Sequence, residues 1–248
     1  MRIARGTYDG GMTHQFQPVI RRAGERGHAS HGWLESWHTF SFGDYYDPAQ
    51  MGFRSLRVIN DDRVAPGGGF PEHTHRDMEI FSYVLSGKLA HMDSLGNSRV
   101  LGPGEIQLMR AGSGIRHSEF NPSVREPARF LQVWITPDIR GLAPAYSEWT
   151  PAGDTEEPKT LVISGDGRDG SATIARDASI YRIKLQPGKS VRHELAAGRG
   201  LWLHVAAGSL AANGIDLAAG DAISLEEAGE IVLSAAGDAA EAILFDLP

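Results

Sequence analysis

Glycine and proline divide this sequence into short pieces and leave little long helical periodicity. The 248 residues include 30 glycines and 13 prolines, and both residue types end regular elements. The pieces between them are rich in β-branched and aromatic residues, which favour strands. The clearest of these pieces are 54–60, 79–85, 130–136 and 180–185. Many short strands with glycine turns are typical of a β-sandwich or β-barrel, so we expect an all-β fold.

The two halves of the chain resemble each other. VLSGKL at 84–89 and LGPGEI at 101–106 have counterparts in VAAGSL at 205–210 and LAAGDAI at 217–223. Each pair predicts a strand, a glycine turn, a strand, a glycine–acid turn and a further strand. A duplicated β-unit is the economical account. The proline-rich stretch between the halves then predicts an N-terminal domain at 1–136, a linker at 137–158 and a C-terminal domain at 159–248.

Composition excludes several classes of function. Cysteine is absent, so disulfides, iron–sulfur clusters, zinc knuckles and thiol nucleophiles are excluded, and a metal site has to use His, Asp or Glu. The net charge is −7 without a run of lysine or arginine, which argues against nucleic acid as a partner. No apolar stretch approaches the roughly 20 residues of a spanning helix, and no leader is visible. We expect a soluble, cytoplasmic, monomeric protein without membrane contact, and a protein partner stays open.

Histidines are concentrated in the first half, where eight of the ten precede residue 118. Alternate residues of a strand face the same side, so His73 and His75 should point into one interior. The same parity holds for His117 and Glu119. Two such pairs on neighbouring strands would supply three imidazoles and one carboxylate, a set that suits Fe(II), Mn(II), Ni(II), Cu(II) or Zn(II). The competing interpretation is chance, because an isolated histidine pair is more often not a ligand pair.

Longer spacing favours the metal interpretation. Residues 67–87 follow the pattern G-x5-H-x-H-x3-E-x7-G, which resembles the first signature of the cupin barrels, and His117-x3-Asn121 resembles the second. In most cupins the acidic ligand would be Glu79. Glu119 competes with it, because it shares the strand face of His117. The first signature is one residue longer than usual before its closing glycine, and Arg110 stands where the second usually has proline.

A narrower resemblance covers most of the first half. The segments 26–48, 51–64, 67–87, 91–97 and 104–121 are similar to those of the pirin family, whose members carry two cupin barrels. The resemblance implies a bicupin with a degenerate second barrel. It also implies the ligand set His73, His75, His117 and Glu119, with Glu79 close to the metal but not bound to it.

The pirin resemblance further implies quercetin 2,3-dioxygenase activity, in which O₂ opens the ring of a flavonol or related enol and carbon monoxide is released. The cofactor would be one divalent transition-metal ion, with Fe(II) favoured over Cu, Mn, Ni, Co or Zn. Glu119 would be the catalytic base that takes the proton from the flavonol 3-hydroxyl. The alternatives are an iron-dependent redox-sensing protein that binds a regulator or enzyme, and a zinc-bound structural barrel.

The sequence also supports expectations for the second half and for single residues outside the predicted ligand set. The second half holds only His193 and His204, so a structural domain is expected there. Arg110 either changes the charge at the pocket rim or lies on the outer face, and it stands where the pirin family frequently has serine. Trp37 likewise replaces a frequent arginine. Asp61, Asp62, Glu156 and Glu157 are expected as solvated loop charges. The side chains of the 28–38 segment could line a pocket mouth, although core or edge packing of its aromatic rings is favoured: His28, His31, Trp33, Trp37 and His38. Gln107, Met109 and Ile115 are expected to line the cavity, with plain core packing as an equal alternative for Met109 and Ile115.

Overall fold

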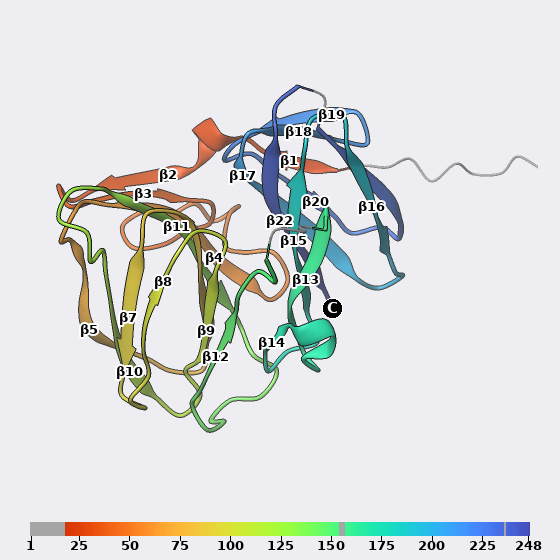
Figure 1. The fold of residues 1–248 in the computed structure, drawn as a ribbon. Coiled ribbons are helices and arrows are strands. Elements are labelled where there is room, and N and C mark those ends of the chain that lie inside the picture. The colour runs from red at the N-terminus through yellow and green to blue at the C-terminus, as the bar shows by residue number, and fades with distance from the viewer. Residues whose placement is uncertain (1–17, 154–156, 236) are drawn as a thin grey trace, which may run out of the picture.

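The protein is built from two β-barrel units that lie side by side (Figure 1). The structure is a computed structural model that describes residues 18–153, 157–235 and 237–248. Each unit consists of one seven-stranded and one four-stranded sheet. The two helical turns in the described residues are short 3-10 elements, η1 (Ala23–Glu25) and η2 (Arg168–Gly170). The predicted all-β bicupin fold is therefore confirmed.

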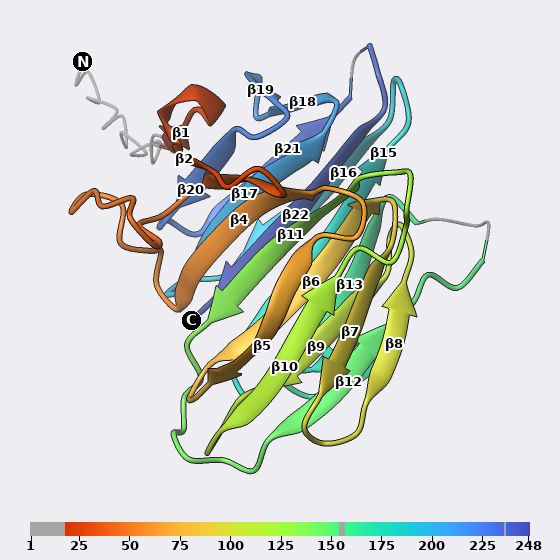
Figure 2. The ribbon, with the colours of Figure 1, turned by 90° about the vertical axis from the view of Figure 1, so that its left-hand side faces the viewer.

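In the first unit the seven-stranded sheet has the order β12-β9-β6-β11-β4-β3-β2, and the four-stranded sheet has the order β5-β10-β7-β8. Figure 2 shows the four-stranded sheet facing the viewer. The strands are β2 (Gly27–Ser30), β3 (Leu34–His38), β4 (Leu56–Val64), β5 (Gly69–His75), β6 (Glu79–Ser86), β7 (Leu89–Asp93), β8 (Ser98–Leu101), β9 (Ile106–Arg110), β10 (Ile115–Phe120), β11 (Ala128–Ile135) and β12 (Ala145–Trp149).

The second unit repeats this arrangement, with sheet orders β1-β20-β17-β22-β15-β13-β14 and β16-β21-β18-β19. The order β9-β6-β11-β4 of the first unit corresponds to β20-β17-β22-β15, as a duplication requires. The strands are β1 (Val19–Arg21), β13 (Lys159–Ser164), β14 (Ala172–Thr173), β15 (Ser179–Leu185), β16 (Ser190–Leu195), β17 (Gly200–Ala207), β18 (Ser209–Ala212), β19 (Ile215–Ala218), β20 (Ala222–Leu225), β21 (Gly229–Ser234) and β22 (Ala240–Leu247).

Two strands were not predicted from the sequence. β12 falls within the predicted linker 137–158 and pairs with β9 at the edge of the first sheet. β1 begins the described chain but pairs with β20 in the sheet of the second unit. The domain boundaries stay a prediction, and the chain crosses between the units at both of these strands.

The two seven-stranded sheets pack against each other through their outer faces. One apolar cluster joins Phe81 and Leu131 of the first unit to Trp202 and Phe245 of the second. Because the inner faces of the same strands are also covered, β6 and β11 are buried almost along their whole length. Strand parity alone therefore could not tell which side chains face the barrel and which face the other unit.

The aspartates of β4 correct one expectation. Asp61 and Asp62 were predicted as solvated loop charges, and this is wrong, because both lie within the strand and are only 3% and 2% exposed. They stay inside the protein because Asp61 pairs with arginines and Asp62 bonds to a serine hydroxyl. Glu157 is exposed as expected, and Glu156 lies outside the described residues. Within those residues no helix has the length and apolar character needed to cross a lipid bilayer.

Candidate metal centre

Three histidines converge inside the first barrel. β5 carries His73 and His75, and the neighbouring β10 carries His117 directly opposite His73. One ring nitrogen from each lies within 4.8 Å of the others. The two Nε2 atoms of His73 and His117 are 3.2 Å apart. The structure thus brings together the three residues in the way that strand parity predicts.

The protonation of these rings suits a metal ion. Nδ1 of His73 donates to the carbonyl oxygen of Pro71 at 2.8 Å, which leaves the lone pair of Nε2 free towards the other rings. Burial, and then the neighbouring imidazoles, lower the pKa of His75 to about 4 and that of His117 to about 3. At neutral pH the rings of His75 and His117 are therefore uncharged, as metal ligands must be.

The distances support the same conclusion. Two nitrogens that each lie about 2.0–2.1 Å from one ion are roughly 2.8–3.4 Å apart, the lower end for cis ligands of an octahedral ion and the upper end for a tetrahedral ion. The 3.2 Å between His73 and His117 falls in this range. Without a cation, two lone pairs at that distance would repel each other unless a proton lay between them. The residues present fit a divalent transition-metal ion, whose identity this donor set does not select.

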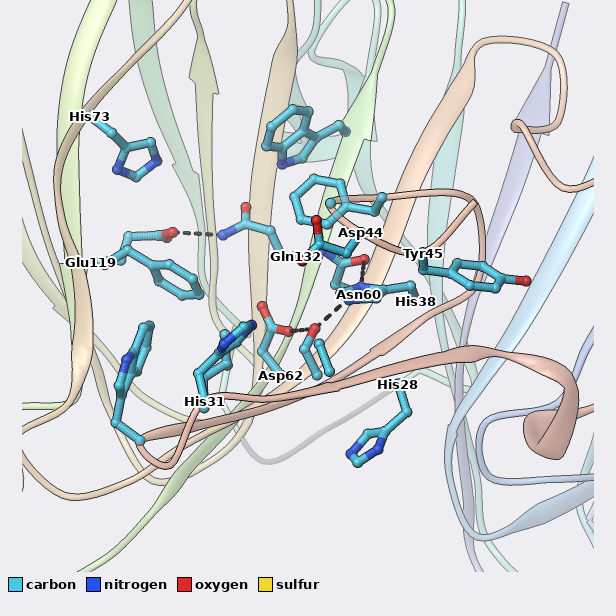
Figure 3. Close-up of a pocket in the computed structure, with 18 of the residues that line it drawn as sticks. His28, His31, His38, Asp44, Tyr45, Asn60, Asp62, His73, Glu119 and Gln132 are labelled. Atoms are coloured by element: carbon cyan, nitrogen blue, oxygen red, sulfur yellow. Dashed lines mark hydrogen bonds between the residues drawn. The ribbon is translucent and has the colours of Figure 1, made fainter. Parts of the chain in front are cut away.

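Glu119 lies on the same strand face as His117 and lines the same cavity (Figure 3). The residue is 1% exposed, and its carboxylate accepts three hydrogen bonds. Ser82 Oγ and Gln107 Nε2 donate to Oε1 at 2.6 and 2.8 Å, and Gln132 Nε2 donates to Oε2 at 2.6 Å. Glu119 is not part of the converging group of ring nitrogens. Its role as a fourth ligand stays a prediction.

Glu79 faces the other side of the sheet. It shares the outer face of β6 with Phe81 and Tyr83, which belong to the core between the two units. Nε of Arg110 lies 3.2 Å from its carboxylate. Burial raises the pKa of Glu79, although the charge of Arg110 opposes this. Arg110 is accordingly an outer-face residue, and neither side chain lines the cavity.

The cavity has a volume of about 750 Å³ and extends from the histidines to the β2–β3 hairpin. Of the two roles expected for the aromatic and histidine side chains of this hairpin, four of them have the less favoured one, lining the cavity, and one has the favoured one, packing. Because β3 pairs with β4, the hairpin extends the sheet past the histidines and covers one side of the cavity. The four that line it are His28, His31, His38 and Trp33. Trp37 does pack, between the His28 ring and the guanidinium of Arg63.

Further residues of this region were predicted incompletely. Gln107 reaches the site through Glu119, whereas Met109 and Ile115 belong to a small apolar cluster. His91 was not singled out, although it is fully buried and its ring centroid lies 5.4 Å from that of His117. Its other face stacks on Tyr146. Only its place in a segment similar to the pirin family could have pointed to it.

The second barrel has a different interior. Its inner faces form an aliphatic cluster that includes Leu203, Leu217 and Ile231. His193 bonds to Asp246 at 2.9 Å, and His204 is fully buried in the neighbouring unit contact. The two histidines therefore lie in separate environments, His193 beside Asp246 and His204 near the charges of Arg26, Asp61 and Arg129.

Known proteins resemble most of the chain. The Pirin family model matches residues 19–135, and the quercetinase C-terminal cupin domain matches residues 161–247. Quercetin 2,3-dioxygenase of Escherichia coli K12 is 46% identical over 229 residues, which is 92% of this chain and 98% of that protein. A pirin-like protein of Caulobacter vibrioides is 41% identical, over 89% of this chain and 95% of its own length.

Among solved structures, the bacterial pirin of Escherichia coli in complex with nickel(II) has a TM-score of 0.88 and 45% identity, over 94% of this chain and 99% of that chain. Fold and site together define a two-barrel cupin protein with a three-histidine site in its first barrel. At this identity and coverage, the chain belongs to the pirin family.

Proposed function

We propose that this protein is a metal-dependent dioxygenase that opens the ring of quercetin, or of a related flavonol or enol, with O₂ and releases carbon monoxide. The observation that carries the proposal is the convergence of three imidazoles at one end of a cavity of about 750 Å³. A cavity of this size holds an organic molecule of roughly drug size. The names of the relatives support the substrate class, and the nickel complex of one relative supports a divalent ion.

The residues that would hold the ion are His73, His75 and His117, with Glu119 as the fourth ligand. We keep Fe(II) as the favoured ion. When bound, such an ion supplies a binding site for an enolate oxygen and the redox chemistry that O₂ requires. The side chains of the protein itself bind the substrate, orient it and accept its proton.

Glu119 is proposed as the base. In this role one of its carboxylate oxygens takes the proton of the flavonol 3-hydroxyl, and the substrate becomes an enolate. Ser82, Gln107 and Gln132 hold the carboxylate in place with their three hydrogen bonds. The rings of Phe42 and Trp134 line the same cavity and would pack against a planar substrate and exclude water.

The test is turnover by protein reconstituted separately with Fe, Cu, Mn, Ni, Co and Zn. Oxygen uptake and carbon monoxide release are measured with quercetin, against the free ion at the same concentration. We expect turnover above the free ion with at least one metal. If none of the six gives it, the proposed function is wrong.

A matched pair of variants tests the acidic ligand. Glu119→Gln is expected to lower bound metal and turnover by at least about tenfold, since a ligand and its charge are lost. Glu79→Gln is expected to retain the metal content of the native protein, because that carboxylate faces Arg110 on the outer side of the sheet. Equal metal loss in both variants would contradict the ligand assignment.

A further inference from the structure

A row of polar side chains crosses the inner face of the first seven-stranded sheet. Register pairs Gln107 with Ser82, Ser82 with Gln132, Gln132 with Asn60, and Asn60 with His38. All five are buried, with exposed fractions of 8% or less. A buried polar group without a hydrogen-bond partner lowers the stability of the fold, so the residues of this row need hydrogen-bond partners from the protein or from a ligand.

Three members of the row, Gln107, Ser82 and Gln132, donate hydrogen bonds to Glu119. Asn60 and His38 do not. Beside His38 and Asn60, the same two strands carry the next inward-facing register pair, Ser36 and Asp62. We call Ser36, His38, Asn60 and Asp62 the polar wall. All four line the cavity, on the β3–β4 side of it (Figure 3).

The polar wall is organised by its own hydrogen bonds. Nδ1 of His38 donates to Oδ1 of Asn60 at 2.8 Å, and the Ser36 hydroxyl donates to Oδ1 of Asp62. These bonds fix which atoms remain for a ligand. Within the described residues, these bonds use neither Nε2 of His38, nor Nδ2 of Asn60, nor Oδ2 of Asp62.

The remaining atoms match hydroxyl groups. Nε2 of His38 accepts a hydrogen bond and Nδ2 of Asn60 donates one, and these two residues are register neighbours. A hydroxyl both donates and accepts, so a neutral hydroxylated ring satisfies this pair. An anionic group would be repelled by the Asp62 carboxylate. Among the described residues, no lysine or arginine lines the cavity to offset that repulsion.

A line of rings joins the polar wall to the histidine site. The His75 ring lies 4.9 Å from that of Trp134, Trp134 lies 5.4 Å from Phe42, and Phe42 lies 5.3 Å from His38. A flat molecule can therefore rest along aromatic surface with one end at the imidazoles and the other at the polar wall.

We propose that the polar wall is the subsite for the hydroxylated ring of the substrate that lies farthest from the metal-binding histidines. The substrate class is thereby narrowed to planar enols that carry neutral hydroxyls at the distal end. This inference rests on the proposed function for its choice of ligand, but its test is a binding measurement and does not require turnover.

The experiment compares quercetin with galangin, the flavonol that lacks both hydroxyls of the distal ring. Binding is followed by quenching of tryptophan fluorescence, since Trp33 and Trp134 line the cavity. Both the chelator-treated and the metal-loaded protein are titrated. We expect the native protein to bind quercetin about tenfold more tightly than galangin, as one or two net hydrogen bonds provide.

Variants of Asp62 locate the preference. In Asp62→Leu the affinity ratio should fall to about twofold or less, because the side chain can no longer bond to a hydroxyl or to Ser36. Asp62→Asn keeps shape and hydrogen bonding, so it should leave the ratio nearly unchanged. If Asp62→Leu does not fold, Ser36→Ala takes its place, with an expected fall of about threefold.

The outcomes separate the two proposals. A quercetin preference that disappears in Asp62→Leu supports the subsite even if no metal gives turnover, in which case the proposed function alone fails. The subsite is overturned if the native protein binds both flavonols equally or binds neither. It is also overturned if Asp62→Leu keeps the full preference.

Discussion

Asp61 holds two arginines at the junction of the two units, and replacing it tests how strongly that junction depends on charge. Arg129 approaches the carboxylate with two hydrogen bonds of 2.8 and 2.9 Å, and Arg26 lies 3.6 Å away. The Asp61 side chain is 4% exposed, that of Arg26 7% and that of Arg129 22%. Arg129 also donates to the carbonyl oxygen of Ala206 in the second unit.

Asp61→Asn keeps the shape of the side chain and removes its charge, so two largely buried guanidinium groups lose their counterion. Breaking a buried pair in this way costs about 3–5 kcal/mol. For a chain of this size each kcal/mol lowers the melting temperature by about 2–4 °C. We therefore expect a melting temperature lower by roughly 6–20 °C at neutral pH, measured by calorimetry and by urea unfolding.

A double-mutant cycle and a pH series check the cause. Arg129→Met added to Asp61→Asn should recover part of the loss, because one uncompensated charge is removed. Burial alone would raise the pKa of Asp61, but the hydrogen bonds and charge of Arg129, with Arg26, outweigh it and lower the pKa. The stabilisation is thus present above the unfolded pKa of about 4 and is lost as pH falls through the folded value. A change below about 1 kcal/mol at pH 7 would refute the reasoning.

Three further expectations concern the site and the shared core. Burial raises the pKa of Asp62 to about 7 despite the bond from Ser36, so this carboxyl contributes stability that is lost as pH rises from about 4 to about 7. The lowered pKa values of His75 and His117 act in the opposite sense over this range, so the test compares the native protein with Asp62→Asn. The free energy of unfolding of Asp62→Asn should increase relative to that of the native protein as pH rises from about 4 to about 7, and a constant difference would contradict the assignment. Phe245 is fully buried in the core that both units share, so Phe245→Ala should lower the free energy of unfolding by about 3–5 kcal/mol. Calorimetry should still show one unfolding transition, and two separate transitions would count against a shared core. A divalent ion at 100 times its Kd should raise the free energy of unfolding of the native protein by about 2.7 kcal/mol. The same ion should leave the free energy of unfolding of His117→Ala nearly unchanged, and an equal gain in this variant would place the ion elsewhere.

The sequence predicts well whatever depends on local periodicity. Strand segments, glycine turns and the duplication all follow from spacing along the chain, and the structure has β6 and β11 close to their expected bounds. His73 and His75 share a face because they are two residues apart in a strand. The convergence of His117 with them needed the pairing of β10 with β5, which the cupin signatures imply.

Whatever depends on partners distant in the sequence was not predictable in this way. Asp61 and Asp62 look like a solvated pair until Arg26 and Arg129 are placed beside the first and Ser36 beside the second. The two faces of β6 are both buried, so no local pattern separates Glu79 on the outer face from Ser82 on the inner one. The polar wall likewise joins residues that are more than 20 positions apart in the chain.

The pairing of β1 with β20 has a consequence for synthesis. Val19 lies opposite Ser224, so the first described strand waits for a partner about 200 residues later in the chain. At roughly 5–20 residues per second, a ribosome takes about 10–40 s to supply it. During that interval the first barrel can close without β1, whereas the sheet of the second unit cannot gain its β1 edge before β20 is made. Removal of β1 would therefore leave the histidine-bearing barrel its own strands and expose the backbone edge of β20, where the association of unpaired edges is expected.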